Sequence, residues 1–339
     1  MYKIVQEGKA KIKVPKEGKI SKKLPVFYNP VMKLNRDISV LLLSVVENKD
    51  MQIGLPLSAT GVRGIRFLKE LKKDKIKIVK FNDIDKNAVK IIKQNLKLNK
   101  IKSKVKIYNQ DANLFMLEHP GFDYIDIDPY GSPNVFLDSA VKRLARNGIL
   151  AVTATDTGCL AGSYPNACLR KYWAIPKRDE MMHETGLRIL IRKVQLIGAE
   201  HDKALIPIFS YYKDHYFRIF FRGVKGKKKA DEILKQHGMF NDAGPLWLGS
   251  LRDKKIAGKI ARRSDEKFLK TIEKESNINA VGFYNIPKMC KRYKLRMIRQ
   301  DEIIKRIRKK GYKAAETHFM PNSLRSDISL REFLKLLKQ

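Results

Sequence analysis

The segment DIDPYG, residues 126–131, contains residue types that can carry out chemistry on an amine. Asp128 is a carboxylate directly after an apolar, strand-like run. It can accept an N–H and stabilise the positive charge that develops when a nitrogen lone pair attacks an electrophile. Pro129 has a rigidly held carbonyl and no N–H, so this carbonyl is a second acceptor. Tyr130 offers a ring on which a flat base can stack.

Alternating predicted strands and helices position this segment. Strands are expected at 51–57, 76–81, 105–108, 124–127 and 148–155, with helices between them at 61–71, 86–99, 112–118 and 135–145. The alternation predicts an α/β fold with a parallel sheet and helices on both faces. Ligands bind such sheets at the carboxyl ends of the strands, so the residues after each strand are the candidate site.

The strand ends predict a cofactor held without a phosphate loop. Asp83 follows the second strand, where a carboxylate grips ribose hydroxyls. The segment SATGVRG (58–64) follows the first strand and contains neither a GxGxxG nor a GxxxxGK[ST] pattern, which argues against NAD and ATP. A cofactor bound through ribose and backbone contacts alone favours S-adenosylmethionine.

Several of these residues also have structural interpretations. Asp85 is expected as the N-cap of the helix that begins at Lys86, and Asp111 can cap the next helix. Asp, Pro, Gly and Ser are common in turns, so the segment after Asp128 is also compatible with a strand end and an ordinary turn. The sequence leaves these alternatives open.

The charge of the chain predicts a polyanionic partner. The 339 residues include 71 Lys and Arg against 35 Asp and Glu, a formal net charge of +36. Self-repulsion of this size does not stabilise a fold, whereas a nucleic acid partner explains it. Basic runs at 225–229, 253–263 and 303–313 are spread along the chain and favour a folded basic surface. A lysine-rich composition can also reflect growth at high temperature.

The sequence also argues against other classes of protein. Cys159, Cys168 and Cys290 form no CxxC pair, which argues against a disulfide framework and a cysteine-rich zinc site. The N-terminus has no apolar signal-peptide core, and the longest apolar stretch, 38–46, is too short to span a membrane. We expect a cytoplasmic monomer with no membrane segment and no metal.

The DPYG segment resembles the Asp/Asn-Pro-Pro-Tyr signature of amino-methyltransferases. Further segments, in order along nearly the whole chain, resemble the tRNA guanine-26 N2-dimethyltransferase family. They are EGKAKI, FYNPVMKLNRDIS, SATGVRGIRF, NDID, DIDPYGSP, VTATDTGCLAG, HETGLRILI, GPLWLG and THFMPNSLRSD. The resemblance implies a Rossmann-like class I methyltransferase fold, S-adenosylmethionine as cofactor and tRNA as partner. The implied reaction adds one and then a second methyl group to the N2 amine of guanine 26.

The resemblance also implies roles for individual residues. The implied cofactor-binding residues are Arg36, Arg66, Asp83, Asp111 and Ala112. Arg63 is the alternative to Arg66. Phe27 is implied as a second aromatic ring at the target base, opposite Tyr130, and core packing is its structural alternative. A surface charge in the first turn of a helix is the structural alternative for Arg36.

Two departures from the family pattern stand out. Many methyltransferases of this class carry an acid at the end of the first strand, where this chain has Leu55 and Pro56. Many family members carry a cysteine cluster before the segment GPLWLG (244–249), where this chain has no cysteine. We therefore expect no zinc site.

The second half of the chain is expected to complete the sheet and bind RNA. A helix is predicted at 183–198, and strands at 204–212 and 215–223 are predicted to form a hairpin. The composition becomes lysine-rich near residue 224. We therefore expect a methyltransferase domain at 1–224 and a smaller basic α/β domain at 225–339 that binds tRNA.

Two alternative functions remain open. One is an amino-methyltransferase that acts on rRNA or on DNA bases. The other is a non-catalytic RNA-binding protein on a methyltransferase fold, which only the missing first-strand acid favours. Asp83, Asp128 and Tyr130 argue against the second alternative.

Overall fold

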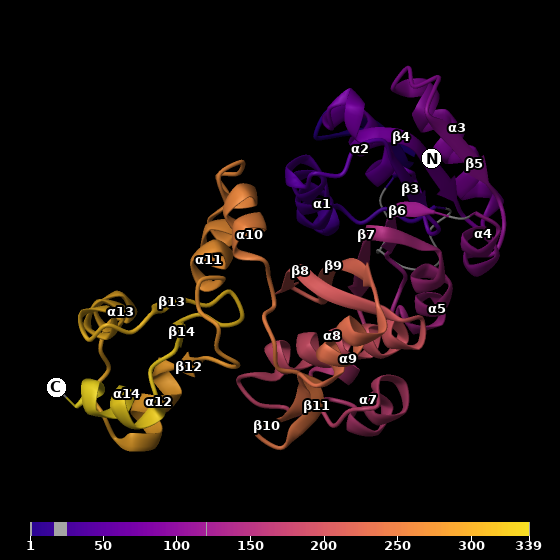
Figure 1. Cartoon of the computed structure of the whole chain (residues 1–339). Coiled ribbons are helices and arrows are strands. Elements are labelled where there is room, and N and C mark those ends of the chain that lie inside the picture. The colour runs from indigo at the N-terminus through magenta and orange to yellow at the C-terminus, as the bar shows by residue number, and fades with distance from the viewer. Residues whose placement is uncertain (1, 17–25, 120, 339) are drawn as a thin grey trace. The chain divides into compact units, whose positions relative to one another are not determined.

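The computed structural model describes residues 2–16, 26–119 and 121–338 (Figure 1). These residues pack into two compact units. The first unit comprises the described parts of Met1–Ala154, with Ile197–Ile206 and Phe220–Asp231. The second comprises the described parts of Thr155–Leu196, Pro207–Ile219 and Glu232–Gln339. The division into domains 1–224 and 225–339 stays a prediction.

A seven-stranded sheet has the strand order β5-β4-β3-β6-β7-β9-β8. The strands are β3 (Met51–Leu55), β4 (Ile76–Asn82), β5 (Val105–Tyr108), β6 (Phe122–Ile127), β7 (Leu144–Ala154), β8 (Lys203–Lys213) and β9 (Tyr216–Lys225). The pairs β3–β4, β3–β6, β4–β5 and β6–β7 are parallel, which confirms the predicted parallel α/β sheet. The strand order reverses between β3 and β6. This switch point is where open α/β sheets bind their ligands.

Helices and a hairpin accompany the sheet in the first unit. They are β1 (Tyr2–Glu7), β2 (Ala10–Pro15), α1 (Lys33–Val45), α2 (Val62–Glu70), α3 (Lys86–Leu98), α4 (Ala112–Glu118) and α5 (Asn134–Arg143), with short 3-10 turns at Pro30–Met32 and Lys73–Lys75. The predicted helices are confirmed to within a few residues. The antiparallel β1–β2 hairpin was not predicted from the sequence.

Local chemistry explains where these elements begin and how closely they pack. The Asp85 side chain accepts from the Asn87 N–H and caps α3, as predicted. Asp111 accepts from the N–H groups of Asn113 and Leu114 and caps α4. Gly64 lies on the sheet side of α2, where a Cβ atom would overlap the Phe81 ring and the Leu55 side chain. This glycine lets α2 approach the sheet at the switch point.

The second unit is built mainly from helices and short strands. They are α6 (Thr157–Leu160), α7 (Pro165–Tyr172), α8 (Met182–Glu200), β10 (His237–Phe240), β11 (Ala243–Trp247), α10 (Lys254–Ala261), α11 (Lys267–Glu275), β12 (Tyr284–Asn285), α12 (Ile286–Tyr293), α13 (Gln300–Lys309), β13 (Ala314–Glu316), β14 (Ser323–Ser326) and α14 (Leu330–Leu337). The helix α8 ends in the first unit, and α9 (Lys227–Leu234) also contributes residues to both units. Apolar side chains from α12, α13, β14 and α14 form one core of the second unit.

A buried network of charged side chains also holds the second unit together. The Arg325 guanidinium pairs with Glu184 of α8 at 2.6 Å and with Glu275 of α11 at 2.9 Å. Glu275 also pairs with Arg252 and His318. Because every member has an opposite charge or hydrogen-bond partner, the network avoids the large cost of an isolated buried charge.

The part of the chain that the structure describes contains neither a membrane-spanning helix nor a cluster of metal-binding side chains. No described helix is long and apolar enough to cross a membrane. No group of three or more His, Cys, Asp and Glu residues within 2–16, 26–119 and 121–338 lies in a position to hold a metal ion.

Candidate active site

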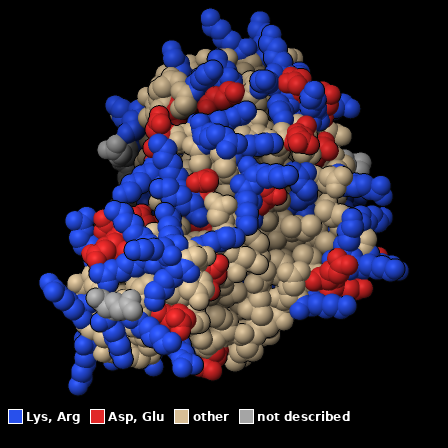
Figure 2. All heavy atoms as spheres, turned by 60° about the vertical axis from the view of Figure 1, so that its left-hand side comes forward, with Lys and Arg blue, Asp and Glu red and all other residues tan. Residues whose placement is uncertain are grey.

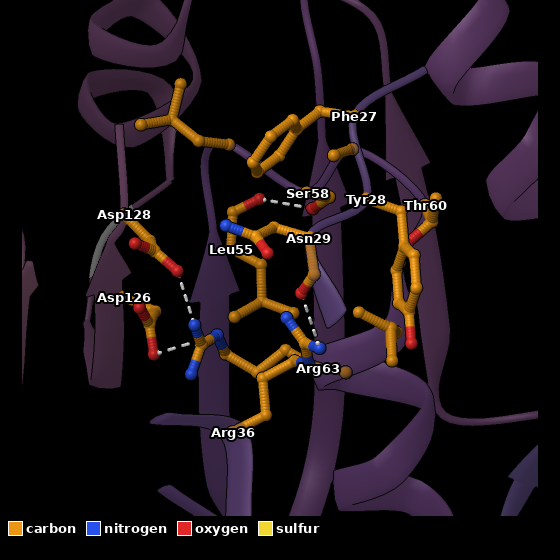
Figure 3. Close-up of a pocket in the computed structure, with 15 residues that line it drawn as sticks. Phe27, Tyr28, Asn29, Arg36, Leu55, Ser58, Thr60, Arg63, Asp126 and Asp128 are labelled. Carbon is orange, nitrogen blue, oxygen red and sulfur yellow. Dashed lines mark hydrogen bonds and ion pairs between the residues drawn. The ribbon is translucent and has the colours of Figure 1, made fainter. Parts of the chain in front are cut away.

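Two cavities of the first unit meet at the carboxyl ends of β3 and β6. The larger has a volume of about 550 Å³ and the smaller about 70 Å³. Both are lined by Phe27, Leu57, Ala59 and Asp128. Figure 3 shows the smaller cavity, with Phe27 and Asp128 among the labelled side chains around it. The sheet therefore brings together segments that lie far apart in the sequence at the position that the strand pattern predicted.

Asp128 lies directly after β6, and its side chain is 24% exposed. The Arg63 guanidinium on α2 donates to one of its carboxylate oxygens. Pro129 and Tyr130 line the larger cavity with it. The carboxylate is thus held by a cation on one side and faces open space on the other, an arrangement suited to accept an N–H from a substrate.

Phe27 and Tyr130 form an aromatic pair at the mouth of the site. Their ring centroids are 4.5 Å apart with an edge-to-face angle of 62°. Tyr130 is 43% exposed, and burial of its hydroxyl raises its pKa to about 12, so its ring is neutral at physiological pH. The contact leaves no room for a flat base between the rings, so a base can enter there only if one ring moves. Phe27 lines both cavities, which argues against simple core packing.

Asp83 lines the larger cavity just after β4. Its carboxylate accepts from the backbone N–H of Ala59 at 2.8 Å and of Asp85 at 3.0 Å. Burial raises the pKa of Asp83, and these two hydrogen bonds oppose that effect. Each carboxylate oxygen keeps acceptor capacity for a further partner, so the group can both tie the loops after β3 and β4 together and accept from hydroxyl groups.

Arg36 is buried and lines the smaller cavity, so its interpretation as a surface charge is wrong. Its Nε and Nη2 atoms donate to the two carboxylate oxygens of Glu7 at 2.6 and 2.7 Å. Glu7 also accepts from Arg66 at 3.1 Å and from the Tyr28 hydroxyl at 3.0 Å. Asn29 contributes a backbone carbonyl to Arg36 at 3.1 Å.

Glu7 is a buried partner of Arg36 that the sequence interpretation did not identify. It ends β1 of the unpredicted N-terminal hairpin, and only 1% of its surface is exposed. Burial raises its pKa, but the hydrogen bond and charge of Arg36 and the charge of Arg66 lower it overall. The signal available in the sequence was the alternation of polar and apolar residues from Lys9 to Val14, directly after the turn residue Gly8, which is typical of a strand that follows a turn.

Three predicted cofactor residues do not line either cavity. Arg66 pairs with Glu7, Asp37 and Glu70 instead. Asp111 caps α4 and Ala112 is buried in its first turn. Their contacts to a cofactor stay predictions. Arg63, the alternative to Arg66, is the arginine of this segment that lines the smaller cavity.

No acid follows β3, as the sequence indicated, and small residues line the site there. Ser58, Ala59, Thr60 and Gly61 border the smaller cavity. The buried Asn82 at the end of β4 donates to the carbonyls of Pro56 and Gln110, each at 3.0 Å, and so joins three strand ends. The sequence interpretation did not single out Asn82, although a polar residue that ends an apolar strand is a usable signal.

Comparisons with known proteins agree with this geometry. The family model for N2,N2-dimethylguanosine tRNA methyltransferase matches residues 8–242 and 235–338. The tRNA (guanine(26)-N(2)/guanine(27)-N(2))-dimethyltransferase of Aquifex aeolicus is 38% identical over 99% of this chain and 96% of its own. The tRNA (guanine(26)-N(2))-dimethyltransferase of Pyrococcus horikoshii is 38% identical over 99% of this chain and 98% of its own.

A solved structure gives the same result. Trm1 from Pyrococcus horikoshii in complex with S-adenosyl-L-methionine is 38% identical, with a TM-score of 0.90 over 99% of this chain and 100% of that one. The expected Rossmann-like methyltransferase fold and the resemblance on which it rested are therefore confirmed. The chain belongs to the N2,N2-dimethylguanosine tRNA methyltransferase family.

Proposed function

We propose that this protein is an S-adenosylmethionine-dependent tRNA methyltransferase that adds one and then a second methyl group to the N2 amine of guanine 26. The observation that carries the proposal is Asp128, which lies at the switch point of the sheet and borders both cavities. Membership of the family and full-length similarity to tRNA guanine dimethyltransferases support it.

The residues present fit the cofactor. A volume of about 550 Å³ lies within the range of small-molecule sites, roughly 300–1,000 Å³. Asp83 offers carboxylate oxygens for ribose hydroxyls, and Val26, Leu57 and Ala88 offer apolar surface in the same cavity. Arg36 supplies a positive charge at the smaller cavity for a carboxylate. When bound, S-adenosylmethionine supplies the methyl group on a positively charged sulfur.

Asp128 and Pro129 act on the amine of the target base. The lone pair of the guanine amine is delocalised into the ring, so the nitrogen is a poor nucleophile. Acceptance of an N–H by Asp128 draws the nitrogen toward tetrahedral geometry and stabilises the positive charge that develops on it. The Pro129 carbonyl is the second acceptor. After one methylation a single hydrogen remains, and Asp128 or Pro129 can still hold it.

The aromatic pair receives the base. A guanine that is paired or stacked in folded tRNA has to leave its stack to reach a site at the strand ends. Tyr130 and Phe27 provide ring surface for it, worth roughly 1–3 kcal/mol per stacked base. Since the two rings touch each other, binding of the base requires that they separate.

The basic surface provides the electrostatic attraction for tRNA. Figure 2 shows Lys and Arg side chains spread over much of the face in view, with fewer Asp and Glu among them. We assign tRNA docking chiefly to the basic segment 225–339, which contains the runs 225–229, 253–263 and 303–313. We also propose that the protein is a monomer and acts in the cytoplasm.

The test is a comparison of wild-type protein with Asp128→Asn on unmodified tRNA. The tRNA is digested after incubation, and its nucleosides are identified by mass. The wild type should produce N2-methylated guanosine at position 26. The variant keeps the shape of the side chain but lacks its charge, so its rate should fall by about 10²–10³. Asp138→Asn is the matched control, because Asp138 is exposed on α5 and lines neither cavity.

The outcomes separate the alternatives. Methylated adenosine or cytidine in the wild-type digest would show another amino-methyltransferase. Binding of tRNA without any methylation, and without cofactor binding in calorimetry, would show a non-catalytic RNA-binding protein. Undiminished guanosine methylation by Asp128→Asn would contradict the role of Asp128.

A further inference from the structure

The Arg63 guanidinium contacts four protein side chains, which leaves it little capacity to bind a cofactor. Arg63 lies on α2, and only 9% of its surface is exposed. Its Nη1 donates to the Asn35 side-chain oxygen at 2.9 Å and to the Ser39 hydroxyl at 2.8 Å. Its Nη2 donates to Asp128, and its Nε lies 3.4 Å from a carboxylate oxygen of Asp126 (Figure 3).

The partners that hold Arg63 are themselves fixed. Asn35 and Ser39 lie one turn apart on α1, and both are fully buried. The Asn35 Nδ2 has no hydrogen-bond partner among the described residues. A buried donor without a partner lowers stability. We therefore take the contribution of Asn35 to be its side-chain oxygen, which accepts a hydrogen bond from Arg63. Asp126 in turn accepts from the buried Tyr124 hydroxyl.

The charges around Arg63 do not cancel. Its single positive charge lies between two carboxylates, Asp126 and Asp128. Arg63, Asp126 and Asp128 together therefore carry one more negative than positive charge, and both carboxylates border the smaller cavity. A carboxylate neutralised by an arginine of its own would stabilise a developing positive charge poorly, whereas Asp128 shares its cation with Asp126 and keeps that ability.

We propose that Arg63 is a positioning residue for methyl transfer: it fixes one carboxylate oxygen of Asp128 so that the other faces the target amine. This proposal rests on the proposed function of the site. It assigns Arg63 to Asp128 rather than to the cofactor, because four of the five N–H groups of its guanidinium face Asn35, Ser39, Asp126 and Asp128. Asn35, Ser39 and Asp126 hold the guanidinium in the required orientation.

Arg63→Ala is the first variant for the test. Single-turnover methylation is measured at saturating S-adenosylmethionine and tRNA, and the affinity for each is measured separately. The rate should fall by about 10–100-fold, the loss expected from one charge-assisted hydrogen bond. The Kd for S-adenosylmethionine should stay close to that of the wild type. Arg146→Ala, at an exposed position of β7, is the matched control.

Two further measurements separate positioning from a merely structural role. Added guanidinium ion, compared with NaCl at the same ionic strength, should restore part of the rate of Arg63→Ala, because it can occupy the vacated space beside Asp128. Arg63→Lys should recover less than the wild-type rate, since one ammonium group cannot reach Asn35, Ser39 and Asp128 together.

Ser39→Ala keeps the test informative if Arg63→Ala fails to fold. This variant leaves the Arg63 charge in place and removes one of its acceptors. The rate should fall, by less than in Arg63→Ala, with the S-adenosylmethionine affinity unchanged. A rate equal to that of the wild type would overturn the proposal.

Other outcomes would also overturn it. A large rise in the Kd for S-adenosylmethionine with an unchanged rate at saturation would make Arg63 a cofactor-binding residue. Absence of guanidinium rescue in folded Arg63→Ala would make its role structural. Each variant's rate is divided by the wild-type rate, and both are measured on the nucleoside that the wild type methylates. The identity of that nucleoside tests the proposed function separately.

Discussion

Glu7→Gln is the change that most directly tests how the N-terminal hairpin supports the active site. Glu7 is almost completely buried and accepts hydrogen bonds from Arg36, Arg66 and Tyr28. Glutamine keeps the size of the side chain. It removes the negative charge and turns one acceptor oxygen into a donor that faces the guanidinium groups.

The size of the expected loss of stability depends on which arginine loses its carboxylate partner. Arg66 keeps the carboxylates of Asp37 and Glu70, whereas Arg36 keeps no carboxylate, only the backbone carbonyl of Asn29 and the face of the Tyr28 ring. Removal of one partner of a buried ion pair destabilises a protein by about 3–5 kcal/mol, and the oxygen retained by glutamine favours the lower value. A unit of this size loses roughly 2–4 °C of Tm per kcal/mol, so Tm should fall by about 6–12 °C.

The effect should depend on pH. The pKa of Glu7 is lowered in the folded protein from its ordinary value of 4.5. Its stabilising contribution is therefore complete above pH 4.5 and is lost as the pH falls through the lower folded value. The difference in Tm between wild type and Glu7→Gln should be largest near neutral pH and should shrink in acid.

The assay is thermal unfolding followed by circular dichroism at several pH values, with calorimetry of S-adenosylmethionine binding at neutral pH. Glu47→Gln is the matched control, since Glu47 is exposed. The control should unfold like the wild type. The Glu7→Gln variant should also bind the cofactor more weakly, because Arg36 at the smaller cavity loses the carboxylate that orients it. An unchanged Tm at neutral pH would refute the reasoning.

Four further outcomes are expected. The logarithm of tRNA affinity should fall linearly with the logarithm of salt concentration, with a slope of about −0.7 to −0.9 per phosphate contact, and a flat line would contradict an electrostatic docking surface. Asp83→Asn should weaken cofactor binding, measured by calorimetry, by about 1.5–3 kcal/mol, while the affinity for tRNA stays unchanged. If the variant binds the cofactor as tightly as the wild type, the role of Asp83 is only to connect the loops after β3 and β4. Burial raises the pKa of Glu184, but the charges of Arg325 and Arg188 lower it to about 2, so Tm measured against pH should drop as the pH falls from 4.5 toward 2. Protein dialysed against EDTA and then freed of it should keep full methylation activity on tRNA folded with Mg²⁺, and a loss of activity that added zinc restores would reveal a required metal.

Local patterns in the sequence were enough to predict the parallel sheet and the strand ends that border the candidate site. The strand ends before Ser58, Asp83 and Asp128 could be identified because apolar runs stop there and polar residues begin. Asp85 could be predicted as an N-cap because the residues it caps follow within two positions. The hairpin at 2–15 was missed because its first strand does not alternate: Ile4 and Val5 are adjacent, and so are Gln6 and Glu7.

What the sequence by itself determined was the order of the elements, and with it the edge of the sheet where Asp83 and Asp128 lie. Only the tertiary structure decided which charges pair. Glu7 and Arg36 are 29 positions apart, and Arg63 and Asp128 are 65 apart. Ion pairs between residues far apart in the sequence have no local signature, because either charge could pair with many others along this highly charged chain. Packing of α1, α2 and the hairpin against the strand ends selects the partners, and burial makes that choice energetically decisive.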